Sequence, residues 1–245
     1  MDLSLFNSAA KRLLPQSFKR RIKVSLGVPD TEACLGRLKR CGFTPHAAID
    51  VGAYSGEWTR TLLRFFPNAQ VLMIEPQAKM RTQLEALCSS NSSLQLAPTL
   101  LGPEVAERVA FYENDSASSV LRDVNHDDPA HRVVAMTTLD VLVVEKNFPA
   151  PDLIKLDVQG YEIQILEGAT QTLKSAQVIL MEINLIQIYE EAPLAHSAIQ
   201  YMADRDFRVY DIGTFFHRPY DNALWQLDML FVRASSPLVA SSRWS

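Results

Sequence analysis

The sequence predicts an α/β fold built on a mostly parallel β-sheet. Two observations support this fold class, and the composition supports a globular protein. Short runs of almost entirely apolar residues recur along the chain, and most are followed by a stretch with helical spacing. Such runs are typical of strands that are covered on both faces, as in parallel sheets. The chain has 245 residues, 47% of them hydrophobic, and a formal net charge of −4. This composition indicates a globular protein and excludes a largely disordered one.

The first half of the chain alternates between predicted strands and helices. An apolar run ends at Gly52, and the helical spacing that follows it stops before Pro67. Residues 115–130 are rich in Ser, Asp, Asn and Pro, which predicts a loop. We expect this loop to be mobile and to lie at the mouth of a ligand site, with Ser118 and Ser119 in it. The predicted strands are 47–51, 70–75, 93–100 and 108–114, and the predicted helices are 55–66 and 77–88.

The second half continues the pattern and ends with two strands. No helical pattern separates these last two strands, so we expect them to pair antiparallel. We predict one domain over residues 46–235, preceded by a basic helical segment over 1–45 and followed by a tail over 236–245. The predicted strands are 152–157, 177–183, 207–212 and 225–233, and the predicted helices are 161–173 and 194–205.

The N-terminal segment differs in charge from the rest of the chain. Residues 1–45 hold nine Lys or Arg and three Asp or Glu, a net charge of +6, which leaves −10 for the remainder. Apolar residues interleave with these bases, which predicts two short amphipathic helices broken near Pro15 and Pro29. The segment either caps the domain, which we favour, or contacts an anionic membrane surface through residues 1–28. The acidic remainder argues against a nucleic-acid partner.

Cysteine usage and apolar run lengths indicate the compartment. The three cysteines are odd in number and lack Cys-x-x-Cys spacing, which favours reduced thiols. No apolar run reaches the roughly 18 residues of a membrane span, and the N-terminus lacks the pattern of a signal peptide. We therefore expect a cytoplasmic protein.

Glycines and carboxylates follow the first two predicted strands, where ligands bind in open α/β sheets. Gly52 and Gly56 permit a tight turn close to a ligand, and Glu75 lies 19 residues after Gly56, where an acid commonly holds ribose hydroxyls. These features suit a nicotinamide dinucleotide or S-adenosylmethionine. The alternatives are that Asp50 caps the following helix and that Glu75 is a solvated acid at the strand end.

Two residues distinguish these cofactors. Tyr54 occupies the position of the middle glycine in the dinucleotide fingerprint, and Asp50 places a negative charge beside the turn. A carboxylate attracts a sulfonium or ammonium group by on the order of 4 kcal/mol before desolvation. The sequence therefore favours S-adenosylmethionine.

A second group of charged residues follows the later strands. Strand alternation places Lys155 and Asp157 on one face, Glu162 lies in the first turn after Gly160, and Glu182 ends the neighbouring strand. We expect the three acids to converge near the transferred group. They either act as a base that orients hydroxyls, or they bind a divalent cation through Asp157 and Glu182. Alternatively, Lys155 pairs with Glu182 and Glu162 only favours its helix dipole.

The residues quoted so far resemble the FkbM family of S-adenosylmethionine-dependent methyltransferases. The resemblance covers about residues 46–233, and its most specific part is the block at 153–162. One departure is Gln159, where an acid is usual. Further matching features are Thr138-Leu139-Asp140, Ser118-Ser119 and Met181-Glu182. The main motifs are Ala48-Ile49-Asp50-Val51-Gly52-Ala53-Tyr54-Ser55-Gly56-Glu57-Trp58-Thr59, Ile74-Glu75-Pro76, Leu153-Ile154-Lys155-Leu156-Asp157-Val158-Gln159-Gly160-Tyr161-Glu162 and Leu166-Glu167-Gly168-Ala169.

The resemblance implies a class I methyltransferase sheet, Rossmann-like, with S-adenosylmethionine as cofactor and Mg²⁺ as a candidate second one. It implies O-methylation of a small-molecule or glycan hydroxyl. The expected catalytic residues are Asp157, Glu162, Glu182 and Lys155. The expected cofactor-binding residues are Asp50, Gly52, Ala53, Tyr54, Gly56, Glu75, Pro76, Leu101, Ser119 and Asp157.

Two other functions stay open on the sequence. A nicotinamide-dependent oxidoreductase would use the same sheet, although Tyr54 and Asp50 argue against it. A non-catalytic cofactor-binding domain would keep the fold alone. His217, in a predicted late loop, is an alternative base. Zinc-ligand spacing and the phosphate-binding Gly-x-x-x-x-Gly-Lys motif are absent from the sequence.

Overall fold

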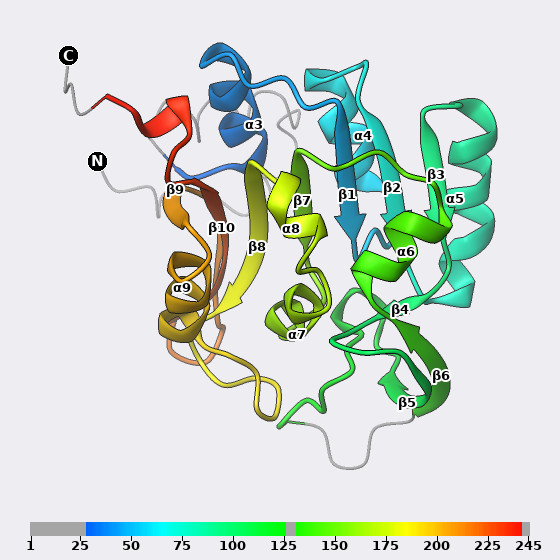
Figure 1. The fold of residues 1–245 in the computed structure, drawn as a ribbon. Helices are drawn as coiled ribbons and strands as arrows, with labels where there is room; N and C mark the ends of the chain where they lie inside the picture. The colour runs from blue at the N-terminus through cyan, green and yellow to red at the C-terminus, as the bar shows by residue number, and fades with distance from the viewer. Residues whose placement is uncertain (1–27, 126–130, 242–245) are drawn as a thin grey trace, which may run out of the picture.

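A seven-stranded sheet forms the centre of the computed structural model, which describes residues 28–125 and 131–241. The strand order is β3-β2-β1-β7-β8-β10-β9 (Figure 1). Neighbouring strands are parallel except for the two pairs that involve β10, which confirms the predicted fold class. The strands are β1 Ala47–Val51, β2 Gln70–Ile74, β3 Leu94–Ala97, β7 Leu153–Leu156, β8 Val178–Asn184, β9 Phe207–His217 and β10 Leu224–Arg233.

Helices cover both faces of this sheet, because successive strand residues are apolar toward both sides. In β1, Ile49 and Val51 pack in one hydrophobic core and Ala48 packs in the other. The first core includes side chains of α6 Leu139–Glu145, α7 Glu162–Glu167, α8 Thr172–Ser175 and α9 Ala195–Ala203. The second includes side chains of α3 Thr31–Arg40, α4 Glu57–Phe65 and α5 Ala78–Ser90 (Figure 1).

Several elements differ from the sequence-based expectation. The expected helix over 161–173 is divided into α7 and α8 around Gly168, where a Cβ would lie 2.2 Å from the Gly102 carbonyl oxygen. The expected strand over 93–100 is divided into β3 and β4, and β9 continues to His217. A second sheet, β4-β6-β5, was not predicted, nor were β6 and α6. Its strands are β4 Leu100–Leu101, β5 Ala106–Tyr112 and β6 His131–Thr137.

Part of the basic N-terminal segment belongs to the domain. Asp30 caps α3 by accepting a hydrogen bond from the Ala33 N–H at 3.0 Å, and Leu35 and Leu38 are buried. The Arg37 Nε donates to Asp211 of β9 at 2.6 Å. This supports the capping interpretation for α3, whereas the expectations for residues 1–27 lie outside the described residues.

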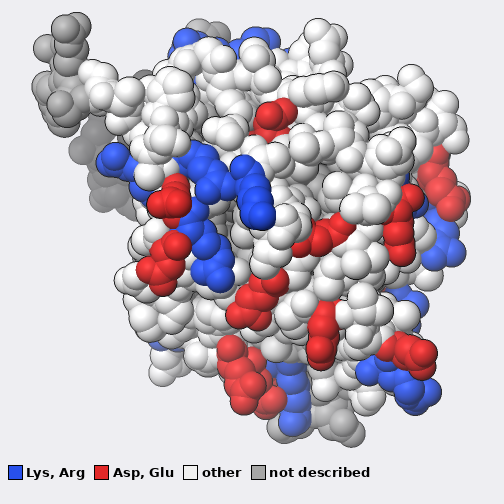
Figure 2. All heavy atoms as spheres, in the orientation of Figure 1, with Lys and Arg blue, Asp and Glu red and all other residues white. Residues whose placement is uncertain are grey.

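Charge is mixed on the face of the molecule seen in Figure 2. Acidic and basic side chains lie near one another in small groups there, and uncharged areas separate these groups. Within the described ranges, no helix is long and apolar enough to cross a membrane.

Candidate active site

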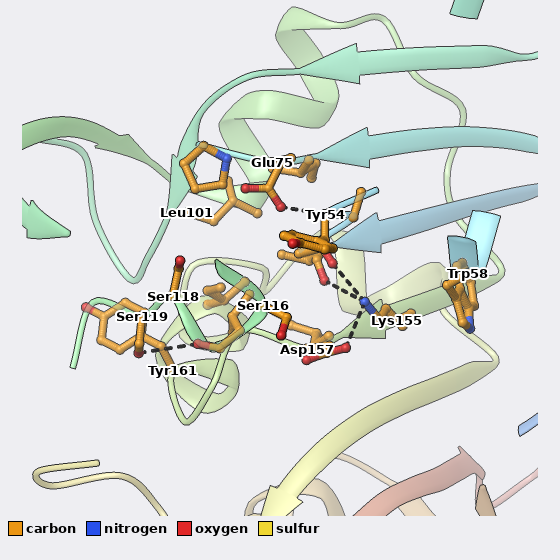
Figure 3. Close-up of a pocket in the computed structure, with 18 of the residues that line it drawn as sticks. Tyr54, Trp58, Glu75, Leu101, Ser116, Ser118, Ser119, Lys155, Asp157 and Tyr161 are labelled. Carbon is orange, nitrogen blue, oxygen red and sulfur yellow. Dashed lines mark hydrogen bonds and ion pairs between the residues drawn. The ribbon is translucent and has the colours of Figure 1, made fainter. Parts of the chain in front are cut away.

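A cavity of about 500 Å³ lies at the carboxyl ends of β1, β2 and β7. Parallel strands end at the same edge of a sheet, so the segments that follow them meet there. Figure 3 shows side chains from these segments around one space. Nine of the predicted site residues line the cavity: Gly52, Ala53, Tyr54, Glu75, Pro76, Leu101, Ser119, Lys155 and Asp157.

The turn after β1 depends on glycine. Gly52 has φ +73°, and a Cβ there would lie 2.0 Å from the Asp157 carbonyl oxygen. Its N–H and that of Ala53 donate to the carbonyl of Ile74, which joins the ends of β1 and β2. Gly56 also has positive φ, but it begins α4 and does not line the cavity. Gly52 therefore brings three strand ends together, whereas Gly56 lets the start of α4 pack against α5, where a Cβ would lie 2.7 Å from Leu87 Cδ1.

Glu75 presents a fixed carboxylate to the cavity. Its Oε2 accepts a hydrogen bond from the Tyr54 N–H at 2.8 Å, and its Oε1 accepts one from the Gln77 N–H at 2.9 Å. The residue is buried, and burial raises the pKa of its carboxyl. Each oxygen still has a lone pair for a ligand hydroxyl. This arrangement suits the predicted binding of a ribose diol.

Asp50 does not line the cavity, so the structure gives no support to its expected direct contact with a cofactor. It lies opposite Lys155 in the β1–β7 register, and its side chain is fully buried. One carboxylate oxygen accepts from the Thr59 hydroxyl at 2.7 Å, and the other lies 3.3 Å from the Lys155 ammonium. A charge that is buried this completely needs partners inside the protein. Asp50 therefore positions Lys155.

Lys155 pairs with Asp50 and Asp157, so the alternative that paired it with Glu182 is wrong. Its ammonium lies 3.3 Å from Asp157 Oδ2 and donates to the Gly52 carbonyl at 2.9 Å. Burial acts to lower the pKa of Lys155, but the carboxylates of Asp157 and Asp50 outweigh it and raise this pKa above its usual value. Lys155 is therefore a charged link between the first strand turn and Asp157 (Figure 3).

Gln159 bridges the two carboxyl groups that were expected to converge. Its amide nitrogen donates to Asp157 at 3.1 Å and to Glu182 at 2.6 Å, and its amide oxygen accepts from the Tyr189 hydroxyl at 2.9 Å. Burial and the nearby Asp157 raise the pKa of Glu182 well above its usual value. Asp157 lines the cavity and Glu182 does not, so only Asp157 is placed to contact a ligand in the cavity.

Glu162 is close enough to Asp157 and Glu182 to affect their charges, but it does not line the cavity, so its expected catalytic role stays a prediction. Its Oε1 accepts hydrogen bonds from the Val158 N–H at 2.9 Å and from the Gly160 N–H at 3.2 Å. It is buried, which raises the pKa of its carboxyl to about 7. Glu162 therefore holds the turn that carries Asp157.

The segment after β5 is attached to this turn. The Ser119 hydroxyl donates to the Gln159 carbonyl at 2.9 Å and accepts from the Leu121 N–H at 3.0 Å. Asp115 forms an ion pair with Lys79 of α5. Ser116, Ser118 and Ser119 line the cavity, as expected for a segment at its mouth. His126, in the same predicted loop, lies outside the described residues.

Sequence reasoning missed Asp228 and Thr31, which also line the cavity. Asp228 of β10 lies opposite Glu182 of β8. The Thr31 hydroxyl donates to Asp228 Oδ2 at 3.0 Å. Burial and the nearby Asp157 raise the pKa of Asp228 to about 6. A lone Asp between Leu227 and Met229 in an apolar strand was the available signal. His217 is exposed and does not line the cavity, which argues against it as a base.

The expected magnesium site at Asp157 and Glu182 has no support. Across residues 28–125 and 131–241, no group of three or more His, Cys, Asp and Glu side chains is placed to hold a metal ion. Both carboxyl groups instead accept the Gln159 amide.

The strand order, the antiparallel β10 and the cavity at the ends of β1, β2 and β7 define a Rossmann-like class I methyltransferase fold. The sequence profile of the methyltransferase FkbM domain matches residues 50–209, which include Gly52, Glu75 and Asp157. The chain therefore belongs to the FkbM methyltransferase family.

One curated relative is the hexuronic acid methyltransferase AglP of Haloferax volcanii, at 31% identity over 75 residues. The match covers 28% of this chain and spans only 31% of the relative's length. Magnesium protoporphyrin IX methyltransferase from Synechocystis, solved with bound S-adenosylmethionine, is 12% identical with a TM-score of 0.48, covering 83% of this chain and 77% of its own. The N-methyltransferase NodS from Bradyrhizobium japonicum is 13% identical with a TM-score of 0.46, covering 94% of each chain.

Proposed function

We propose that this methyltransferase uses S-adenosylmethionine to methylate a hydroxyl of a sugar, a glycan or a secondary metabolite. The charge of the cavity carries the proposal. Its lining includes one cationic side chain, Lys155, which is already paired, and five acids: Glu32, Glu57, Glu75, Asp157 and Asp228. Such a lining attracts the sulfonium and ammonium groups of S-adenosylmethionine and repels the pyrophosphate of a nicotinamide dinucleotide.

The residues present fit this cofactor. The absence of a side chain at Gly52 leaves the backbone open to close approach, and Glu75 would accept hydrogen bonds from the ribose hydroxyls. Leu101 and Phe111 line the cavity and supply an apolar wall for the adenine ring of the cofactor. When bound, S-adenosylmethionine supplies a methyl group that is already electrophilic on its sulfonium.

Asp157 is the residue that we assign as the base. Of the two acids that Gln159 bridges, Asp157 lines the cavity and Glu182 does not. The side chain of Asp157 is 37% exposed. Lys155 and Gln159 fix its two oxygens. Asp157 would accept the proton of the acceptor O–H as the acceptor oxygen takes the methyl group, whose bond to sulfur breaks and leaves S-adenosylhomocysteine.

The nature of the acceptor follows from the family and from the partial relative. AglP is described as a hexuronic acid methyltransferase, which supports a sugar acceptor; the anionic charge of a hexuronic acid is not carried over, because the match spans only 31% of that protein.

Substitution of the base tests this function. Asp157→Asn keeps the size of the side chain and removes its charge, so turnover should fall by about two to four orders of magnitude. Turnover is measured as methyl-sized mass gain in a panel of hydroxylated acceptors. The control is Asp206→Asn, an exposed aspartate in the turn before β9. Near wild-type turnover of Asp157→Asn would remove Asp157 as the base.

A further inference from the structure

The cavity has a second end, away from Glu75 and Leu101. Figure 3 shows Trp58 beyond Lys155, on the side opposite Leu101. Thr31, Trp58, Thr214, Phe216 and Asp228 line the cavity from α3, α4, β9 and β10. We propose that these five residues form the acceptor subsite and that the subsite selects a neutral or amine-bearing polyhydroxylated molecule over an anionic one. The inference rests on the proposed function, because it assigns the rest of the cavity to the cofactor.

The subsite contains several hydrogen-bonding groups. The Thr31 hydroxyl donates to Asp228 Oδ2 at 3.0 Å and lies 2.9 Å from the Thr214 hydroxyl. The Trp58 indole N–H is buried and has no hydrogen-bond partner among the described residues. Hydroxyls both donate and accept, carboxylates accept and an indole donates, so these groups together complement a ligand with several hydroxyls.

The aromatic side chains complement the other face of such a ligand. Trp58 is partly buried, whereas Phe216 is 45% exposed on β9. Exposed aromatic rings beside polar groups are typical of binding sites for small molecules. A ring-shaped polyol presents C–H groups on its faces and hydroxyls at its edge, which matches this combination of side chains.

The charge of the subsite gives its selectivity. The carboxyl groups of Asp228 and Glu32 both line the cavity. Lys155, the cation on the lining, is held by Asp50, Asp157 and the Gly52 carbonyl. Arg64 does not line the cavity, and it forms an ion pair with the cavity-lining Glu32 at 2.7 Å. Among the described residues, an anionic acceptor would therefore meet carboxylates on the lining without a cation there that lacks a carboxylate partner.

Calorimetry with a matched set of probes tests the inference. The protein is first saturated with S-adenosylhomocysteine and then titrated with methyl glucopyranoside, its 2-amino analogue and methyl glucuronide, which share one ring and differ in charge. The neutral and amine probes should bind at least about tenfold more tightly than the glucuronide. In Asp228→Asn this preference should shrink to about threefold or less. The control, Asp206→Asn, should keep the wild-type preference.

Three results would overturn the inference: tighter binding of the glucuronide, no binding of either preferred probe, or an unchanged preference in Asp228→Asn. If Asp228→Asn fails to fold, Phe216→Ala replaces it, and unchanged affinity for the neutral probe contradicts the subsite. Absence of S-adenosylhomocysteine binding in the wild type would instead contradict the proposed function. The two failures are therefore distinguishable.

Discussion

At the scale of single residues, the acids of this site differ in what surrounds them. Glu75 holds two backbone N–H groups and keeps lone pairs for a ligand, whereas Glu162 is enclosed and binds only its own turn. Asp50 is neutralised by Lys155 beneath the cavity. Their positions at strand ends and in the first helical turn could be predicted from the sequence. Their directions could not, because these depend on side chains from distant strands and helices.

Replacement of Glu75 tests its assignment to the ribose. Glu75→Ala should weaken S-adenosylhomocysteine binding by about 1–3 kcal/mol, because charged hydrogen bonds to the hydroxyls are lost. Isothermal titration measures the affinity. Glu75 also orders the Tyr54 and Gln77 amides, so thermal unfolding must show that the variant is folded. Unchanged affinity in the folded variant would show that Glu75 does not contact the ligand.

Stability should depend on pH through Glu162. Its pKa is about 7 in the folded protein, above the usual 4.5, so the folded state keeps a proton that the unfolded chain releases between these values. The contribution of this group to the free energy of unfolding is therefore full below about pH 4.5 and is lost as pH rises toward 7. Glu162→Gln has no such group. As pH rises from about 4.5 to about 8, the free energy of unfolding of wild type should therefore fall relative to that of Glu162→Gln, by up to about 3 kcal/mol.

Denaturant unfolding of both proteins at several pH values measures this difference. Gln keeps an oxygen that accepts from the Val158 and Gly160 amides, so the turn itself is retained. Parallel pH profiles of wild type and variant would contradict the burial argument.

At the scale of elements, alternation along the strands explains the site. Ala48, Leu153, Leu180 and Leu230 pack in the core beneath α3–α5, so Asp50, Lys155, Glu182 and Asp228, two residues away on each strand, share that face. Strands β1 and β2 could be predicted from the sequence because their apolar runs are continuous. The exposed β6 could not, since a small sheet with one solvated face gives a weak apolar signal, and α6 could not, because seven residues are too few to show helical spacing.

The segment 115–121 belongs to this scale, because its backbone connects two elements. Ser119 pairs with Tyr112 of β5 through two backbone hydrogen bonds and contacts the turn after β7 through its hydroxyl. Binding of S-adenosylhomocysteine should slow amide exchange around Ser118 and Ser119, because the ligand fills the cavity that they line. Hydrogen exchange with and without ligand measures this. Equal exchange in both states would leave the segment without contact to the ligand.

At the scale of the whole molecule, the order of the strands places the two ends of the cavity. The segment after β2 supplies Glu75, the small sheet supplies the apolar wall of Leu101 and Phe111, and the β8-β10-β9 side supplies Asp228, Thr214 and Phe216. The fold class could be predicted from the sequence, because β-α repetition and the motif at 153–162 identify it. The second end could not, because α3 and β10 meet there although Thr31 and Asp228 are 197 residues apart.

The central claim is that this cavity binds a sulfonium cofactor. Calorimetric titration of the full chain with S-adenosylhomocysteine and, separately, with NAD tests it most directly. The acidic lining predicts saturable binding of S-adenosylhomocysteine and no detectable binding of NAD, because the carboxylates repel the pyrophosphate. Saturable binding of NAD without binding of S-adenosylhomocysteine would contradict the claim.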